Sequence, residues 1–246
     1  MPELQPLRKT LLGVKLIYFA IMSSLILVCA SPVLAFGIAS FGLGPIKLWQ
    51  LETAVALLLG YVWLLVLVGQ VLTASVPTEF GGKLCAQISA ALTGLSLAVL
   101  IALFGYSTII TRSQGEVSQI VAAGGIANTA IQVIGLLLFM CFARQTSSLL
   151  GNHIVARKFG SSTTLILFCV FLYGAFYVTT IAMSQTGKNG QGDVQWIPYL
   201  FLGTALLVGV FTFFRFVNAL RELALELTKC VRDRSAPQLS EVATNR

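Results

Sequence analysis

Charged side chains are scarce in this 246-residue sequence. Asp, Glu, Lys and Arg together make up 10% of the residues, whereas 57% are hydrophobic. A soluble domain carries about 25% charged residues, so one soluble core would not hide this much apolar surface. Long apolar segments are stable when lipid surrounds them. The scarcity of charge therefore predicts an integral membrane protein whose main partner is the lipid bilayer.

Residue types that bind metals or catalyse reactions are also few. His153 is the single histidine, and the five cysteines form no C-x-x-C pair. The two aspartates, Asp193 and Asp233, lie outside the apolar segments. The chain contains no H-E-x-x-H, G-x-S-x-G or P-loop motif. We therefore predict no metal, no cofactor, no disulfide and no enzymatic activity.

The net charge of +7 does not indicate nucleic-acid binding. Such binding needs basic residues gathered on one module, whereas here they are spread along the chain near the ends of apolar segments. Basic flanks on the cytoplasmic side of a membrane explain the charge. Nucleic acid is therefore not expected as a partner.

The apolar segments are continuous runs of roughly 20 residues, the length that a membrane-spanning helix needs. A β-barrel would instead show strands of about 10 residues that alternate apolar and polar side chains. The sequence thus predicts an all-α, polytopic membrane protein with six transmembrane helices in a single domain, residues 1–234. The predicted spans are 12–34, 51–74, 84–110, 120–143, 162–183 and 196–216.

The basic residues lie mostly on one side of the predicted bundle. Of the 16 Lys and Arg residues, Lys47, Arg112 and Lys188 fall on the opposite side. The positive-inside rule then places both termini in the cytoplasm, as in a cell membrane (plasma or inner). An alternative for the first segment is a cleaved signal peptide, because Val33-Leu34-Ala35 resembles a cleavage site.

The six spans also fit three repeated helical hairpins. Aligning Lys83 with Lys158 brings Gly60 onto Gly135, and nearly the same offset brings Gly135 onto Gly209. The alternative is that six similar helices with similar loops align by chance. Both interpretations stay open at this point.

After the last span, residues 220–231 form an amphipathic pattern, with Leu220, Leu223 and Leu227 on one side. Such a helix lies on a membrane surface or docks onto a protein partner. The short polar tail, 235–246, is predicted to be disordered.

Small residues recur every four positions along the third span, and the pattern predicts a helix-packing seam. The seam consists of Ala86, Ala90, Gly94, Ala98 and Ala102.

Few polar side chains fall within the spans. Asn128 and Gln132, four residues apart, share one face of the fourth span. They are candidates for a hydrogen bond between helices or for the lining of a polar cavity. Arg144 and Arg215 lie at the ends of spans four and six, where arginine side chains can reach the lipid headgroups and act as interfacial anchors.

These features favour a non-enzymatic structural or accessory membrane subunit. The alternative is a transporter or channel for a neutral or apolar solute or lipid; charged substrates would need a buried counter-charge. A continuous cavity that reaches one side and touches Asn128 and Gln132 would favour transport, and a filled bundle with no cavity would favour the structural role.

The predicted orientation can be checked by cysteine labelling on a background without the native cysteines. A membrane-impermeant reagent should modify a cysteine at position 188 (Lys188→Cys) in intact cells, because this loop is expected outside. A cysteine in place of Arg157 should stay unmodified until the membrane is permeabilised. The reverse pattern would overturn the orientation.

Overall fold

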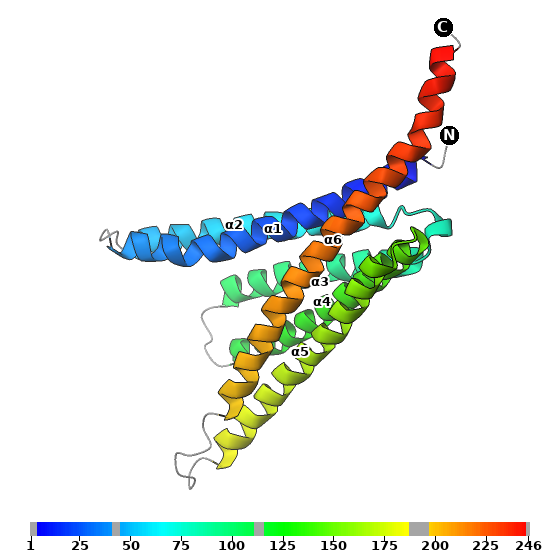
Figure 1. Cartoon of the computed structure of the whole chain (residues 1–246). Coiled ribbons are helices and arrows are strands. Elements are labelled where there is room, and N and C mark those ends of the chain that lie inside the picture. Colours follow the sequence, from blue (N-terminus) through cyan, green and yellow to red (C-terminus); the bar gives the residue numbers. More distant parts are fainter. Residues whose placement is uncertain (1–3, 41–44, 111–115, 187–196, 245–246) are drawn as a thin grey trace.

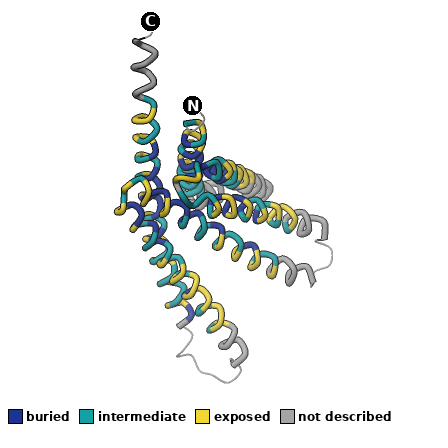
Figure 2. Tube along the Cα trace, turned by 90° about the vertical axis from the view of Figure 1, so that its right-hand side faces the viewer, coloured by how far each residue is buried: buried dark blue, intermediate teal, exposed yellow. Residues whose placement is uncertain are grey.

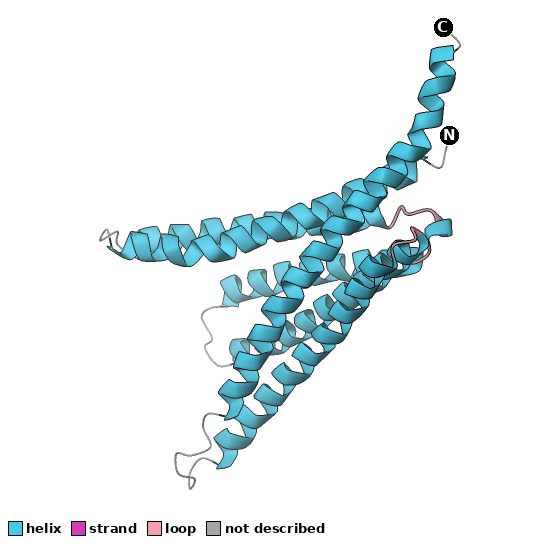
Figure 3. Ribbon diagram, in the orientation of Figure 1, coloured by secondary structure: helices cyan, strands magenta, loops and turns pink. Residues whose placement is uncertain are grey.

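The computed structural model describes residues 4–40, 45–110, 116–186 and 197–244, and no strand occurs among them. Their six α-helices and one 3₁₀ turn are shown in Figure 3. In chain order they are α1 (Leu4–Ser40), α2 (Pro45–Thr73), η1 (Thr78–Phe80), α3 (Lys83–Ile110), α4 (Glu116–Leu149), α5 (His153–Thr186) and α6 (Ile197–Thr244).

Five of these helices contain a stretch that is long and apolar enough to cross a membrane. The exception is α2, whose apolar stretch within the described residues is the shorter segment Gly60–Thr73. The predicted helical, multi-pass membrane fold is therefore confirmed. Large hydrophobic side chains are exposed on the helices, such as Leu57 of α2, Phe171 of α5 and Leu207 of α6. Their exposure suits contact with the lipid bilayer.

The helices pair in chain order, so the molecule consists of three hairpins. The most extensive contacts join α1 with α2, α3 with α4, and α5 with α6. In Figure 1 the three hairpins diverge from the region where both termini lie. Gly81 and Gly82 lie between the first two hairpins, and Gly151 lies between the last two; all three have positive φ angles, of 64°, 68° and 79°. Glycine adopts this backbone conformation without strain, which permits a tight turn at both places.

The hairpins are joined by one buried apolar cluster, which we call the hub. Among the residues whose burial is described, every helix except α2 contributes to it, and Val76 lies three residues after the end of α2. Figure 2 shows buried residues concentrated where the hairpins converge and exposed ones along their diverging ends. The hub consists of Leu7, Val14, Ile17, Val76, Ala86, Phe139, Met140, Phe142, Ala143, Val155, Phe159, Phe216, Ala219, Leu220, Leu223 and Leu227.

Much of the hub is built from residues outside the predicted spans. Leu7 of α1, Val155 and Phe159 of α5, and Leu223 and Leu227 of α6 are all almost fully buried. The helices continue past the apolar segments because backbone hydrogen bonding within a helix does not require lipid. Residues that leave the hydrocarbon meet water, so they gain from packing against one another.

The expectation for residues 220–231 needs correction. These residues are part of α6, and the apolar face formed by Leu220, Leu223 and Leu227 is buried in the hub. That face is covered by the chain itself and is not presented to a membrane surface or to a protein partner. α6 also continues as a helix to Thr244, across most of the tail for which the sequence analysis expects disorder.

The two helices of the first hairpin approach each other closely at Gly13 and Gly69. A Cβ added to Gly13 would lie 2.5 Å from the backbone oxygen of Gly69, and a Cβ added to Gly69 would lie 2.9 Å from the backbone oxygen of Gly13. Small residues let two helix backbones approach in this way within a membrane. The close approach of α1 and α2 therefore depends on both glycines.

Gly13→Ala should lower the thermal stability of the purified protein in detergent. The added methyl group meets backbone atoms that cannot turn away, and overpacking of this kind costs about 1–3 kcal/mol. Gly60→Ala is the matched control in the same hairpin, because nothing lies within 4 Å of its added Cβ. Alanine's helix propensity should stabilise that variant by up to about 1 kcal/mol. Equal melting temperatures for the two variants would contradict the glycine contact.

Candidate functional site

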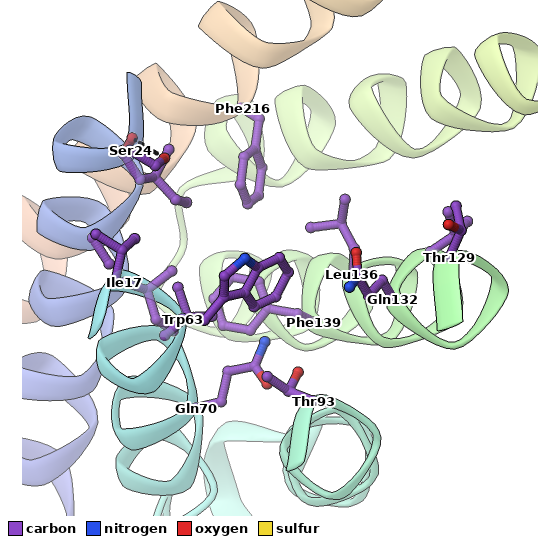
Figure 4. Close-up of a pocket in the computed structure, with 15 residues that line it drawn as sticks. Ile17, Ser24, Trp63, Gln70, Thr93, Thr129, Gln132, Leu136, Phe139 and Phe216 are labelled. Carbon is purple, nitrogen blue, oxygen red and sulfur yellow. Dashed lines mark hydrogen bonds between the residues drawn. The ribbon is translucent and has the colours of Figure 1, made fainter. Parts of the chain in front are cut away.

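A cavity of about 330 Å³ lies between the three hairpins. Helices α1, α2, α3, α4 and α6 all contribute to its wall, so each hairpin supplies part of it (Figure 4). The lining residues are Ile17, Ala20, Ile21, Ser24, Val62, Trp63, Val66, Gln70, Thr93, Thr129, Gln132, Val133, Leu136, Phe139 and Phe216.

The hub forms one boundary of this cavity. Ile17, Phe139 and Phe216 belong to both the hub and the lining. The rings of Phe139 and Phe216 meet edge to face with their centroids 6.4 Å apart, a favoured aromatic geometry. The packing that joins the hairpins therefore also fixes one wall of the cavity.

Most of the lining is apolar, with a few polar groups among the hydrocarbon and aromatic side chains. Gln70 on α2 is the most unusual of them. Its side chain is 6% exposed, and its Oε1 atom accepts no hydrogen bond from any described residue. Figure 4 shows the amide nitrogen of Gln70 turned toward the cavity and its oxygen beside Thr93. A buried carbonyl without a partner is unfavourable, so the oxygen of Gln70 lowers the stability of this part of the bundle.

The two polar candidates of the fourth span have different surroundings. Gln132 lines the cavity, and its Nε2 donates a hydrogen bond to Ser96 Oγ of α3 over 3.1 Å. Asn128 is 3% exposed and is not part of the lining, and its Oδ1 has no hydrogen-bond partner among the described residues. Gln132 thus holds two helices together and also faces the cavity, whereas Asn128 is buried outside the lining.

The small-residue seam of α3 enters the bundle at one end. Ala86 and Ala90 are buried and Gly94 is half-buried, whereas Ala98 and Ala102 are exposed. A four-residue step turns about 40° further than one full helical turn, so Ala102 faces about 160° away from Ala86. A Cβ added to Gly94 would make one ordinary contact, at 3.7 Å from Leu67 Cδ1.

The face of α3 that packs against α4 carries hydroxyl groups instead. Ser89, Thr93 and Ser96 are all buried, and Ser89 Oγ donates to the backbone oxygen of Gly135 over 2.8 Å. Gly135 is buried in this contact, whereas a Cβ added to Gly60 or to Gly209 would meet nothing within 4 Å. The glycines aligned in the sequence repeat therefore have different environments, although three hairpins are present.

The two arginine candidates lie close to the hub. Arg144 is exposed, with its guanidinium carbon 3.6 Å from the position of a Cβ on Gly160 of α5. Arg215 is half-buried beside Phe216, and its Nε has no hydrogen-bond partner in the described part of the chain. Between α5 and α6, Lys158 Nζ lies 2.5 Å from Glu222 Oε1. Neither arginine lines the cavity.

Sequence reasoning missed the cavity and the place of Gln70 in its lining. The available signal was a glutamine near the end of an apolar span. Such a glutamine occurs equally often in a contact between helices, so it does not indicate a cavity. Comparison of the chain with protein-family models, with curated proteins and with solved structures gave no significant match. The function must therefore be argued from the cavity and its lining.

Asn128 and Gln132 should respond oppositely to replacement by leucine. Gln132→Leu removes the hydrogen bond to Ser96 and leaves a buried hydroxyl without its donor; hydrogen bonds between membrane helices contribute about 0.6 kcal/mol on average and up to about 1.7. Asn128→Leu removes a carbonyl that has no partner, so it should be neutral or stabilising. Thermal unfolding in one detergent compares the two variants, and equal destabilisation would contradict the assigned contacts.

Proposed function

We propose that this chain is a non-enzymatic membrane carrier that binds a neutral, largely apolar solute or lipid between its three hairpins. The observation that carries the proposal is the cavity of about 330 Å³. Its volume lies at the lower end of the range for ligand pockets, about 300–1,000 Å³. Its mixture of apolar walls and a few polar groups is also typical of such pockets.

The absence of ionisable side chains among the lining residues favours a neutral ligand. A charged ligand in an apolar site needs a counter-charge, because desolvation of an unpaired charge is very unfavourable. General acid–base catalysis likewise needs a titratable group within reach of the substrate. The hydroxyl groups of Ser24 and Thr129 donate hydrogen bonds to backbone oxygens of their own helices, over 2.8 and 2.9 Å. The lining thus supports binding without chemical conversion of the ligand.

Carriage, in addition to binding, is supported by the arrangement of the hairpins around the cavity. They are joined at the hub and diverge beyond it (Figure 1). A site between units that can rock against each other changes its access when they move. With the cytoplasmic orientation inferred from the basic residues, the hub would lie on the cytoplasmic side of a cell membrane.

A structural or accessory subunit is the second candidate, and the surface of α5 favours it. In the 18-residue apolar window of the stretch His153–Thr180, 6% of the residues are buried within the chain. Phe168, Phe171, Tyr173 and Tyr177 are all exposed on it, and aromatic side chains are enriched at protein interfaces. A protein that co-purifies in mild detergent and protects this surface would support the accessory role.

Quenching of tryptophan fluorescence tests ligand binding, because Trp63 lines the cavity. The test uses a chain with Trp49→Phe and Trp196→Phe, in phosphatidylcholine nanodiscs to which 12-bromododecan-1-ol is added. A ligand held beside Trp63 should quench its fluorescence saturably, whereas bromine dissolved in the bilayer quenches in proportion to its amount.

Val133→Phe is the matched variant for this test, because the larger side chain should fill part of the cavity. It should weaken the saturable quenching about tenfold or more, while circular dichroism shows that the helices persist. Quenching that never saturates in the parent chain would refute the carrier proposal.

A further inference from the structure

Two cysteine side chains meet where α3 packs against α4. Cys85 lies in the first turn of α3, and Cys141 lies about two turns before the end of α4. Both are free thiols, and both are half-buried. The two thiol groups are hydrogen-bonding neighbours. Such a pair differs chemically from a single cysteine, because a second thiol can convert the oxidised form of the first into a disulfide.

Close contacts on both sides of this cysteine pair hold α3 and α4 in register. On one side, Ser89 Oγ donates a hydrogen bond to the backbone oxygen of Gly135 over 2.8 Å. On the other side, a Cβ added to Gly82 would lie 3.0 Å from the Cα atom of Phe142. The cysteine pair lies between these two contacts along both segments of the chain. The packing of the second hairpin therefore keeps the two thiols close together.

The surroundings of Cys141 favour its thiolate form. Gln145 lies one helical turn further along α4, and its Nε2 donates a hydrogen bond to Cys141 Sγ over 3.7 Å. A hydrogen bond to the charged form of a group favours that form, and the thiolate is the nucleophile in cysteine oxidation. Gln145 is exposed, so a small polar oxidant can approach this end of the hairpin. Cys141 is therefore the thiol expected to react first, with Cys85 as its neighbour.

We propose that Cys85 and Cys141 form a site of reversible oxidation by peroxides, which joins α3 to α4 through a disulfide. The Cys141 thiolate attacks one oxygen of hydrogen peroxide and the O–O bond breaks. Cys141 becomes a sulfenic acid, and the leaving hydroxide takes up the proton that Cys141 released. The Cys85 thiol then attacks the sulfenic sulfur, the S–O bond breaks and water leaves. Two thiols are oxidised to one disulfide, and one peroxide is reduced to two waters.

This reaction is independent of the carrier proposal. With the orientation inferred from the basic residues, this end of the second hairpin would face the cytoplasm. Thiols stay reduced there unless an oxidant reaches them, so the free dithiol is the resting form. Ala86 and Met140 of the hub directly adjoin the two cysteines in sequence. The disulfide would therefore fasten the second hairpin next to the hub.

Mass spectrometry of the full chain in phosphatidylcholine nanodiscs tests the site. The protein is treated with hydrogen peroxide, the remaining thiols are alkylated with N-ethylmaleimide, and peptides identify any linked residues. The parent chain should lose two alkylatable thiols together and form a link between Cys85 and Cys141 that dithiothreitol reverses. Cys85→Ser and Cys141→Ser should each abolish the link. Cys169→Ser is the matched control at another half-buried cysteine, and it should retain the link.

Dimedone, which labels sulfenic acids, tests the order of the two steps. In Cys85→Ser the sulfenic acid of Cys141 has no thiol to resolve it, so dimedone should label Cys141. In Cys141→Ser, Cys85 should be labelled much less. Gln145→Leu should slow formation of the disulfide about threefold, because the thiolate loses a hydrogen bond. Gln87→Leu makes the same change at an exposed position of α3 and should react at the parent's rate.

Three outcomes would count against the proposal. A parent chain that keeps both thiols at peroxide concentrations that oxidise free glutathione would overturn it, as would loss of thiols without a link between Cys85 and Cys141. Preferential dimedone labelling of Cys85 would overturn the assignment of Cys141 as the nucleophile. If a serine variant does not fold, Cys85→Ala or Cys141→Ala removes the same thiol, and the link should be absent there as well.

Discussion

The hub is the constraint on which the rest of the structure depends, because it joins all three hairpins. Within a bilayer, lipid solvates an apolar helix as well as another helix does, so association there depends on close packing and hydrogen bonds. Near the ends of the spans, water restores the hydrophobic driving force. Leu7, Phe159, Leu223 and Leu227 are buried where the helices extend beyond the predicted spans, which agrees with this division. The spans themselves show the other kind of contact, at Gly13 with Gly69 and at Ser89 with Gly135.

A bundle fastened near one end leaves space between its units. The hairpins diverge from the hub, and the cavity begins at Ile17, Phe139 and Phe216, which belong to both. The aromatic residues therefore stabilise the joint and shape the binding wall at once. A change in the packing of Phe216 would alter the hub and the cavity together. The rigidity of the cavity is thus tied to the stability of the hub, whereas the opposite ends of the hairpins lack such a joint in the described residues.

The sequence was sufficient to predict the fold class, because about 20 consecutive apolar residues have few stable arrangements other than a membrane-spanning helix. It did not predict where the apolar face of residues 220–231 packs. An amphipathic sequence pattern is the same whether its apolar face contacts lipid, a protein partner or the rest of its own chain. Nor did a four-residue spacing identify the packed face of α3. That spacing drifts around the helix, whereas Ser89, Thr93 and Ser96, spaced by four and three residues, stay on one face. Gly13 and Gly69 are far apart in sequence, so their contact follows only from the pairing of α1 with α2.

Gln70 and Asn128 show why an unpaired polar atom does not by itself indicate a binding site. Both are buried, and both carry an oxygen without a partner among the described residues. Asn128 is not part of the cavity lining, so its unpaired carbonyl lowers the stability of the fold without contacting the cavity. Gln70 belongs to the lining of the cavity, but its unpaired oxygen has no exposed surface there. An unpaired oxygen therefore indicates a ligand only where the cavity reaches that oxygen.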